Sequence, residues 1–247
     1  MLIYKLYEEK IKNCRKCQSC GSHLTKPWIG KEYDRRNPKI LFVGGNMNNP
    51  GPGDTDLTKF IDNHPELLSK GLYGFMPRLA KQIFSLSENS PRQLYDHFAF
   101  TNIIKCSPDS NRSKPTNEMW NKCSHIKDEI ELLKPDIIVA MGNDSYAGLV
   151  GQFLAKRDEI VLSEELKKYI TKIKLKETEA FIVKIDHPYE NWAINIAKSR
   201  LSLILEFIDS NSEAHKVLTE ITSRLEYFIA GELINRAIDN NKDYEKI

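Results

Sequence analysis

Apolar residues along this chain concentrate in four short runs that contain few polar positions. Runs of this kind are typical of strands in a parallel sheet whose two faces are both covered by helices. The sequence therefore predicts an α/β fold, a three-layer sandwich around a four-stranded, mostly parallel central sheet. We expect its strands at residues 39–45, 98–104, 136–141 and 180–185.

Between and beyond these runs, apolar residues recur at intervals of three and four, which is the spacing of a helix with one buried face. We expect one such helix to end near Glu88. The pattern predicts one domain over residues 1–208 and a C-terminal helical extension over 209–247. The remaining helices are expected at residues 1–13, 55–70, 116–133, 145–155, 164–173 and 192–208.

Composition and charge narrow the function only a little. The chain has 247 residues, of which 40% are hydrophobic, and a formal net charge of +2. A nearly neutral protein attracts nucleic acid only through local clusters of basic residues. We expect a cytoplasmic protein, because the sequence has no run of about 18 apolar residues and no secretory signal pattern at its start. We also expect a monomer, with the C-terminal helix packed against the body of the domain and not against a second copy.

The five cysteines indicate a metal or cluster site. Cys14 and Cys17 form a CxxC pair near the N-terminus, whereas Cys106 and Cys123 lie in the strand–helix–strand segment over 98–141. Disulfides are rare in a reducing cytosol, and four thiolates from two distant segments can close a tetrahedral site. Such a site would fasten the N-terminal arm to the body of the domain. Spacing alone does not decide between zinc and an iron-sulfur cluster, and free thiols are the plainer alternative.

Several segments follow one another in a recognisable order: CRKC at 14–17, TNIIKCSP at 101–108, NR-x-x-P at 111–115, KPDIIVAMG at 134–142 and then His187-Pro188. In this order and spacing, the chain resembles the uracil-DNA glycosylase superfamily from about residue 14 to residue 192. It is most similar to the iron-sulfur branch, family 4. The resemblance implies a four-iron, four-sulfur (4Fe-4S) cluster, with zinc as the alternative, held by Cys14, Cys17, Cys106 and Cys123.

The first predicted strand ends in GGNMNNPGPGD, residues 44–54. In the iron-sulfur branch the position of Gly45 holds a Glu that helps to prepare the attacking water, and this carboxylate is missing here. Asn46 matches instead the Asn of the mismatch-specific branch, and an amide can hold a water without deprotonating it. We therefore expect Asn46 to position the water, with Asp54 as the alternative, a general base. The plainer interpretation is that these Asn residues only form turns.

Asn102 stands out as a polar residue inside an apolar strand. It takes the place of the Asn that reads the Watson–Crick edge of uracil in the family, and an amide can also face cytosine. A structural amide that ties the strand to a loop is the plainer role. Tyr73 or Phe75 is expected to stack on the base, unless both are ordinary core aromatics. Gly45 is expected to let the backbone approach the base closely.

His187 follows the last predicted strand. In the superfamily this His donates a hydrogen bond to O2 of the departing pyrimidine and stabilises the developing anion, although a lone His is more often structural. Lys105, Arg112 and Lys114 are expected to contact phosphates, with solvated surface charges as the alternative. Trp192 is the candidate for a wedge that enters the duplex.

The resemblance implies a monofunctional DNA glycosylase: water attacks C1′ of a flipped pyrimidine nucleotide and leaves an abasic site in single- or double-stranded DNA. Uracil and a modified, possibly glycosylated, cytosine as in phage DNA are the two expected substrates, in base excision repair or in anti-phage defence. The alternative is a non-catalytic iron-sulfur module that senses damaged or foreign DNA, which the missing Glu and the acidic Glu190 favour. A zinc-stabilised nucleotide-binding protein is a third interpretation.

Overall fold

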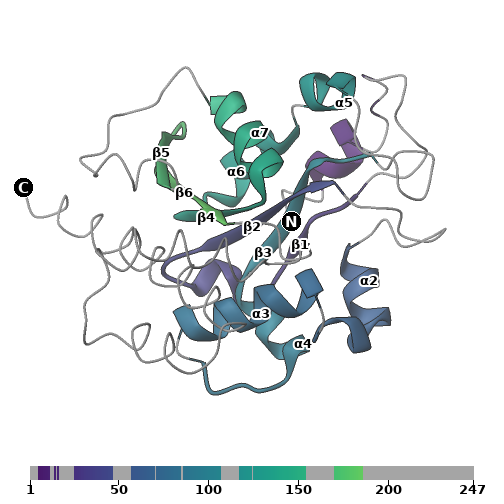
Figure 1. Cartoon of the computed structure of the whole chain (residues 1–247), viewed down its shortest axis with the longest axis vertical. Coiled ribbons are helices and arrows are strands. Elements are labelled where there is room, and N and C mark those ends of the chain that lie inside the picture. Colours follow the sequence, from purple (N-terminus) through teal and green to yellow (C-terminus); the bar gives the residue numbers. More distant parts are fainter. Residues whose placement is uncertain are drawn as a thin grey trace, which may run out of the picture.

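The computed structural model describes residues 5–11, 14, 16, 25–46, 57–69, 71–84, 86–106, 117–123, 125–153 and 170–185. These residues form an α/β fold around one six-stranded sheet, with the strand order β1-β3-β2-β4-β6-β5 (Figure 1). The edge strands β1 (Trp28–Ile29) and β5 (Ile170–Lys174) run antiparallel to their neighbours. The parallel strands are β2 (Ile40–Asn46), β3 (Ala99–Ile104), β4 (Ile137–Met141) and β6 (Glu179–Ile185).

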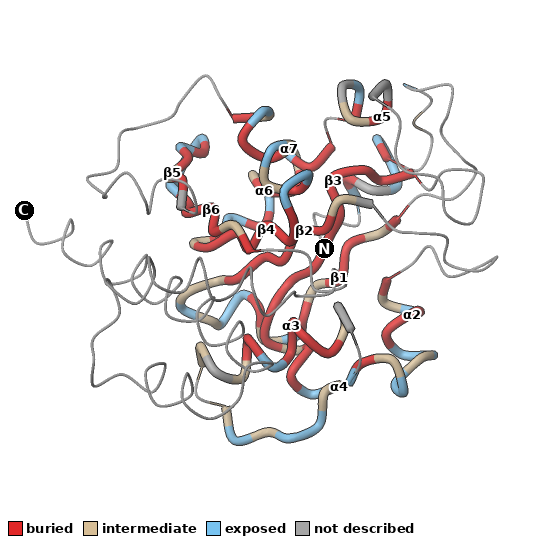
Figure 2. The backbone as a smooth tube through the Cα atoms, viewed as in Figure 1, coloured by how far each residue is buried: buried red, intermediate tan, exposed pale blue. Residues whose placement is uncertain are grey.

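The four parallel strands are those that the apolar runs predict, so this part of the prediction is confirmed. β3 and β4 are buried at every position, and Figure 2 shows the centre of the sheet almost wholly in red. Strands that are covered on both faces have no solvent side, which is why their sequences do not alternate. The prediction of a four-stranded sheet is incomplete, because it omits the two short antiparallel strands at the edges.

Helices cover both faces of the sheet, so the described residues form three layers (Figure 1). Successive side chains of a strand point to opposite faces, and Phe42 accordingly lies in one apolar cluster and Val43 in the other. The first cluster joins the sheet to α2 (Leu57–Asn63), α3 (Gly71–Ile83) and the 3-10 helix η4 (Tyr95–His97), while α4 (Pro91–Leu94) directly precedes η4. The second joins it to the π-helix η1 (Tyr7–Ile11), α5 (Asn117–Lys122), α6 (His125–Leu133) and α7 (Asn143–Phe153).

Residues 170–173 belong to a strand, so the helix predicted over 164–173 is wrong at its C-terminal end. Thr171, Ile173 and Leu175 are buried, while the intervening Lys174 is exposed. This alternation has a period of two, which is the period of a strand with one covered face. The N–H of Leu175 donates to the carbonyl of Thr178 at 2.8 Å and closes the turn that returns the chain as β6.

Other predicted segments also differ in detail. The helix expected to end near Glu88 is α3, which ends at Ile83. The helix predicted over 116–133 is divided into α5 and α6 around Cys123. The helix predicted over 55–70 is α2 followed by the 3-10 helix η3 (Pro65–Leu67), and Pro65 cannot continue an α-helix because it lacks an N–H. The segment over 24–38, read as a loop, contains β1 and the 3-10 helix η2 (Tyr33–Arg35), and its Trp28 is buried.

Residues 186–247 lie outside the described part of the chain. The helix predicted over 192–208, the extension over 209–247 and the division into two regions therefore stay predictions. Within the described residues, no helix is both long enough and apolar enough to cross a membrane.

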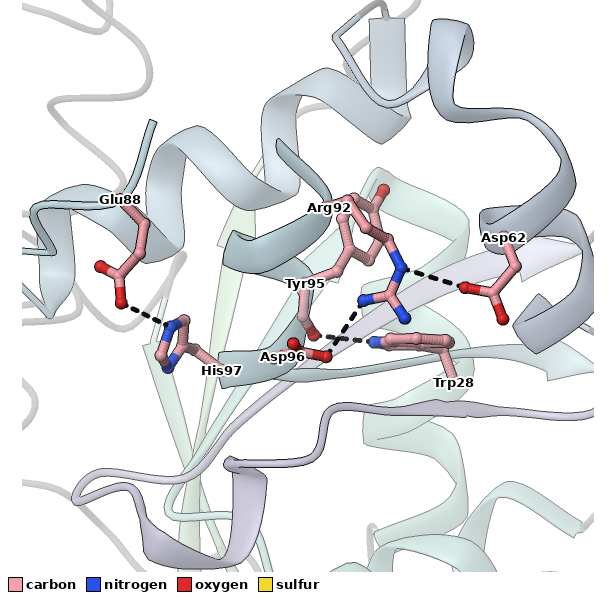
Figure 3. Close-up of polar contacts among 7 residues, drawn as sticks. All are labelled: Trp28, Asp62, Glu88, Arg92, Tyr95, Asp96 and His97. Atoms are coloured by element: carbon pink, nitrogen blue, oxygen red, sulfur yellow. Dashed lines mark hydrogen bonds and ion pairs between the residues drawn. The ribbon is translucent and has the colours of Figure 1, made fainter. Parts of the chain in front are cut away.

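A polar cluster fastens the sheet edge to the helices at the amino end of β3 (Figure 3). The guanidinium of Arg92 lies 4.8 Å from the centre of the Trp28 ring and forms ion pairs with Asp62 and Asp96, each at 3.0 Å. The indole N–H of Trp28 donates to the carbonyl of Tyr95 at 2.8 Å. These contacts join β1, α2, α4 and the 3-10 helix η4 (Tyr95–His97), at the end of the sheet opposite to the carboxyl ends of the parallel strands.

Candidate active site

The carboxyl ends of β2, β3, β4 and β6 meet at one edge of the sheet, because the four strands are parallel and adjacent. Asn46 at the end of β2 pairs with Ile104 of β3, and Met141 of β4 pairs with Ile185 of β6. The chain leaves β2 for β3 on one side and later returns to β4 on the other side. Open α/β sheets bind ligands at such a switch point, so the edge at β2 is where a site is expected.

Asn102 lies near the carboxyl end of β3, opposite Gly44 of β2. The residue is only 2% exposed, and no hydrogen bond joins its side-chain amide to another residue that the structure describes. A buried amide without partners destabilises a fold by about 1–3 kcal/mol. Among the described residues, its donor and acceptor are therefore not used by another side chain or backbone group at this edge of the sheet.

Gly44 is a residue of the candidate site that sequence reasoning missed. A Cβ atom at this position would lie 2.4 Å from Oδ1 of Asn102. No real carbon approaches an amide oxygen so closely, so the Asn102 side chain fits only because residue 44 has no side chain. The GG pair was visible in the sequence, but which of its two residues faces Asn102 depends on the register of β2 against β3.

Gly45, predicted to approach the base, is directed to the opposite face of the sheet. A Cβ atom there would meet Trp120 Cη2 at 3.5 Å and Ser145 Oγ at 3.7 Å, which are ordinary contact distances. These neighbours belong to α5 and α7, whereas Asn102 and Gly44 lie on the side of α3. The structure brings Gly44, and not the position after it, against the candidate base reader.

The two aromatic candidates on α3 have different surroundings. Phe75 is 2% exposed and fills the apolar core beneath the helix, so it offers no free ring face to a base. Tyr73 is half-buried at the margin of the same core. Its ring centre lies 4.8 Å from that of Phe60 and 6.3 Å, edge to face, from that of Phe100. Since Phe100 precedes Asn102 by two residues on the same face of β3, Tyr73 is the better placed of the two.

Lys105, predicted to contact phosphate, is buried, and this prediction is wrong. Its side chain is 1% exposed, and its Nζ lies 2.5 Å from both Oε2 of Glu129 and Oγ1 of Thr101. The Thr101 hydroxyl also donates to Glu129 Oε2 at 2.8 Å. Burial raises the pKa of Glu129, while the ammonium of Lys105 acts in the opposite direction. This group ties β3 to α6, and the buried Lys105 ammonium is paired with Glu129 and not exposed to a phosphate.

Three of the four predicted cysteine ligands are among the described residues. Cys106 and Cys123 are buried in the same apolar cluster, and Cys123 Sγ lies 3.3 Å from the carbonyl oxygen of Ile103. Burial raises the pKa of the Cys123 thiol, and the nearby Cys14 raises it further. The N–H of Cys14 donates to the carbonyl of Ile11 at 2.9 Å, which holds it beside η1. Both distant segments thus supply thiols to one region.

Within the described residues, no group of three or more His, Cys, Asp or Glu side chains is arranged to hold a metal. The backbone of Asn46 is described as the last residue of β2, but its side chain is not. The predicted positions Cys17, Asp54, Arg112, Lys114, His187 and Trp192 lie outside the described residues.

Comparison with known proteins gives one family. The sequence profile of the Uracil DNA glycosylase superfamily matches residues 31–193. A type-4 uracil-DNA glycosylase of Sulfurisphaera tokodaii is 25% identical over 241 residues, which cover 97% of this chain and 95% of the relative. The type-4 uracil-DNA glycosylase of Thermotoga maritima is 28% identical over 141 residues, 57% of this chain and 62% of the relative. That of Saccharolobus solfataricus is 26% identical over 147 residues, 59% of this chain and 60% of the relative. Two of these three alignments therefore span less than two thirds of the relative's length.

Proposed function

Because the chain belongs to the uracil-DNA glycosylase superfamily, we propose that it is a DNA glycosylase that hydrolyses the N-glycosidic bond of an extruded pyrimidine nucleotide. The observation that carries this proposal is Asn102, a buried amide without a hydrogen-bond partner among the described residues, at the carboxyl edge of the sheet. A nucleobase is the kind of ligand that satisfies such an amide, since its Watson–Crick edge offers a donor and an acceptor side by side.

In this proposal the base lies on the α3 side of β2 and β3, against the Asn102 amide. The amide of Asn102 pairs with N3–H and O4 of uracil or, turned over, with N3 and N4 of a cytosine. Tyr73 supplies the flat face on which the extruded base stacks, and stacking on an aromatic ring is worth about 1–3 kcal/mol per base. The Tyr73 ring is held by its contacts with the rings of Phe60 and Phe100.

The hydrolysis requires a water, a leaving base and a donor for the charge that the base acquires. The bond from C1′ to N1 of the pyrimidine breaks, its electron pair goes to the base, and water oxygen bonds to C1′. Asn46 holds this water, and His187 donates to O2 of the departing base. In the alternative, Asp54 takes the place of Asn46 and accepts the proton that the water loses, as a general base. The base takes up a proton as it leaves. No lysine forms a Schiff base, so the strand stays intact.

The four cysteines Cys14, Cys17, Cys106 and Cys123 hold a 4Fe-4S cluster in this proposal. Its support is that Cys106, which follows β3, and Cys123, which follows α5, lie in one apolar cluster, with Cys14 of the N-terminal arm near Cys123. The cluster would fasten the N-terminal arm to the domain, and base release would not involve it. A brown protein with broad absorption near 400 nm is expected. If the protein is colourless and contains zinc, the four cysteines hold zinc and not an iron-sulfur cluster.

Uracil and a modified cytosine are both compatible with an amide reader, and the assay must include both. Purified protein is incubated with uracil-containing DNA and with modified phage DNA, as single and double strands, and the products are then treated with alkali. If alkali-labile sites form only in the uracil-containing DNA, a role in base excision repair is indicated. If they form only in the modified phage DNA, a role in anti-phage defence is indicated. Strand breaks before alkali treatment would contradict the monofunctional mechanism.

One observation favours a second candidate function, a non-catalytic module that binds damaged or foreign DNA. Residue 45 is a glycine, and its missing side chain is directed away from Asn102, so no carboxylate reaches the pocket from this position. The variants Asn46→Ala and His187→Ala decide between the two. Loss of base release with intact DNA binding supports the glycosylase, whereas full biological effect in both variants supports the binding module.

A further inference from the structure

A Cβ atom added at Gly44 would approach Asn102 more closely than a Cβ atom at any other glycine in the described part of the chain would approach a polar side chain. A methyl group at position 44 would lie 2.4 Å from Oδ1 and 3.6 Å from Cγ of Asn102. Favourable contacts between heavy atoms begin at about 3.5 Å. The amide of Asn102 therefore occupies the volume that a side chain at residue 44 would fill, and it lies directly against the backbone of β2.

We propose that Gly44 is a positioning residue for Asn102: the missing side chain at residue 44 sets the direction in which the amide presents its donor and acceptor. This inference rests on the proposed function in one respect, namely that the ligand of the Asn102 amide is a pyrimidine. Gly44 itself touches no substrate and acts through Asn102. The register of β2 against β3, with Gly44 opposite Asn102, is what gives this glycine its role.

The surroundings determine what a methyl group at residue 44 does. Cε2 of Phe100 lies 3.7 Å from the same point and belongs to the packed core, so the amide cannot move in that direction. Asn102 is 2% exposed, so little space is open toward solvent either. The side chain must turn away from β2. A displacement of about 1 Å in a positioned group lowers a catalytic rate by about 100-fold.

Two other glycines provide matched controls for the same Gly→Ala change. At Gly148 of α7, a Cβ would lie 2.8 Å from Ile103 Cδ1 and 3.2 Å from Trp120 Cζ3, so this position is also too crowded for a Cβ but lies in the other core. At Gly151 of α7, nothing lies within 4 Å of the added atom. G148A therefore tests the effect of crowding away from Asn102, and G151A tests the Gly→Ala change without any crowding.

The test measures single-turnover base release and DNA affinity for the variants G44A, G148A and G151A. The probes are a uracil-containing oligonucleotide and a fragment of modified phage DNA. We expect G44A to lose about 100-fold in the rate constant with an unchanged Kd for DNA. G148A keeps the wild-type rate constant per folded molecule although it unfolds at lower urea, and G151A keeps both. A G44A rate constant within twofold of wild type overturns the proposal.

A double-mutant cycle asks whether Gly44 acts through Asn102. In the N102A background the methyl group has no amide to displace, so G44A/N102A is expected to release base at the same rate as N102A. A further loss of the same size as in wild type overturns the proposal.

A crystal structure of G44A gives a readout that needs no activity. We expect the Asn102 amide to have turned away from β2 with the strand itself in place, and an unmoved amide overturns the proposal. If the wild-type protein releases no base from any DNA, the proposed function fails, and this crystal structure still decides the positioning claim.

Discussion

The Nζ of Lys105 and the Oε2 of Glu129 lie 2.5 Å apart in the core between β3 and α6, with exposures of only 1% and 0%. Thr101 completes the group, and the other carboxylate oxygen of Glu129 has no partner among the described residues. The N–H of Lys105 also donates to Cys123 Sγ at 3.4 Å. This buried ion pair therefore anchors the carboxyl end of β3 beside Cys106 and Cys123.

Removing one partner of this pair is expected to destabilise the protein strongly. Glu129→Leu leaves the Lys105 ammonium buried without a counter-charge, and a lowering of the unfolding free energy by about 3–5 kcal/mol is expected in urea titrations. The double variant Lys105→Met/Glu129→Leu recovers most of this loss, because no charge stays buried. The control is Glu32→Gln in the exposed pair with Arg35, expected to change stability by less than about 1 kcal/mol. Equal losses of unfolding free energy for Glu129→Leu and Glu32→Gln would contradict a stabilising role of the buried Lys105–Glu129 ion pair.

Arg92 is expected to stabilise the opposite end of the sheet through its geometry as well as its charge. Arg92→Lys keeps the charge but loses the planar stacking on Trp28 and the two-sided pairing with Asp62 and Asp96 (Figure 3). A loss of about 1–2 kcal/mol is expected for Arg92→Lys in thermal or urea unfolding. Base release per folded molecule should not change, since the cluster lies at the far end of β3. A Lys variant as stable as wild type would show that charge alone is sufficient.

The pH dependence of stability is expected to report on His97. Burial lowers the pKa of His97, Arg36 lowers it further, and Glu88, whose Oε1 lies 3.5 Å from its Nε2, acts in the opposite direction. The folded protein therefore binds this proton less readily than the unfolded chain. Stability is present above the ordinary His pKa of about 6.5 and is lost as pH falls below it, by at most about 1.4 kcal/mol per pH unit.

The variant His97→Gln isolates this contribution from those of the other histidines. Urea unfolding at pH 7.5 and at pH 5.5 should show a smaller loss of stability on acidification in His97→Gln than in wild type. If both proteins lose the same amount, His97 does not take up a proton differently in the two states.

Tyr73 and Phe75 should separate stacking from core packing. Tyr73→Phe keeps a ring and is expected to retain base release, whereas Tyr73→Ala removes the stacking face and should lower kcat/KM by about 5- to 150-fold. Phe75→Leu should lower the midpoint of urea unfolding and leave the rate per folded molecule unchanged, because this ring lies in the core. A strong rate loss in Phe75→Leu with normal stability would reverse the assignment of the two rings.

The parallel core of the fold could be predicted from the sequence because its strands are buried on both faces and therefore read as continuous apolar runs. The two edge strands could not be predicted in the same way. Segment 170–174, ITKIK, carries lysines on its exposed side, so its alternation was interpreted as a charged helix. β1 has only two residues, too few to show any period.

The candidate site was predictable only where a residue's chemistry contradicts its surroundings. Asn102 is conspicuous because it is polar inside an apolar strand. Lys105 was misassigned to the surface because nothing in the sequence pairs it with Glu129, which is 24 residues away. Gly44 was missed for the same reason, since its importance follows from strand register and not from its neighbours in the chain.

The most direct test of the central claim is mass-spectrometric detection of the free base released from uracil-containing and modified phage DNA by wild-type protein and by Asn102→Ala. The wild type is expected to release one free pyrimidine and to leave alkali-labile sites, and Asn102→Ala should lower that rate by roughly 100-fold or more. No free base from any DNA, or equal release by the two proteins, would contradict the reading of an extruded pyrimidine by Asn102.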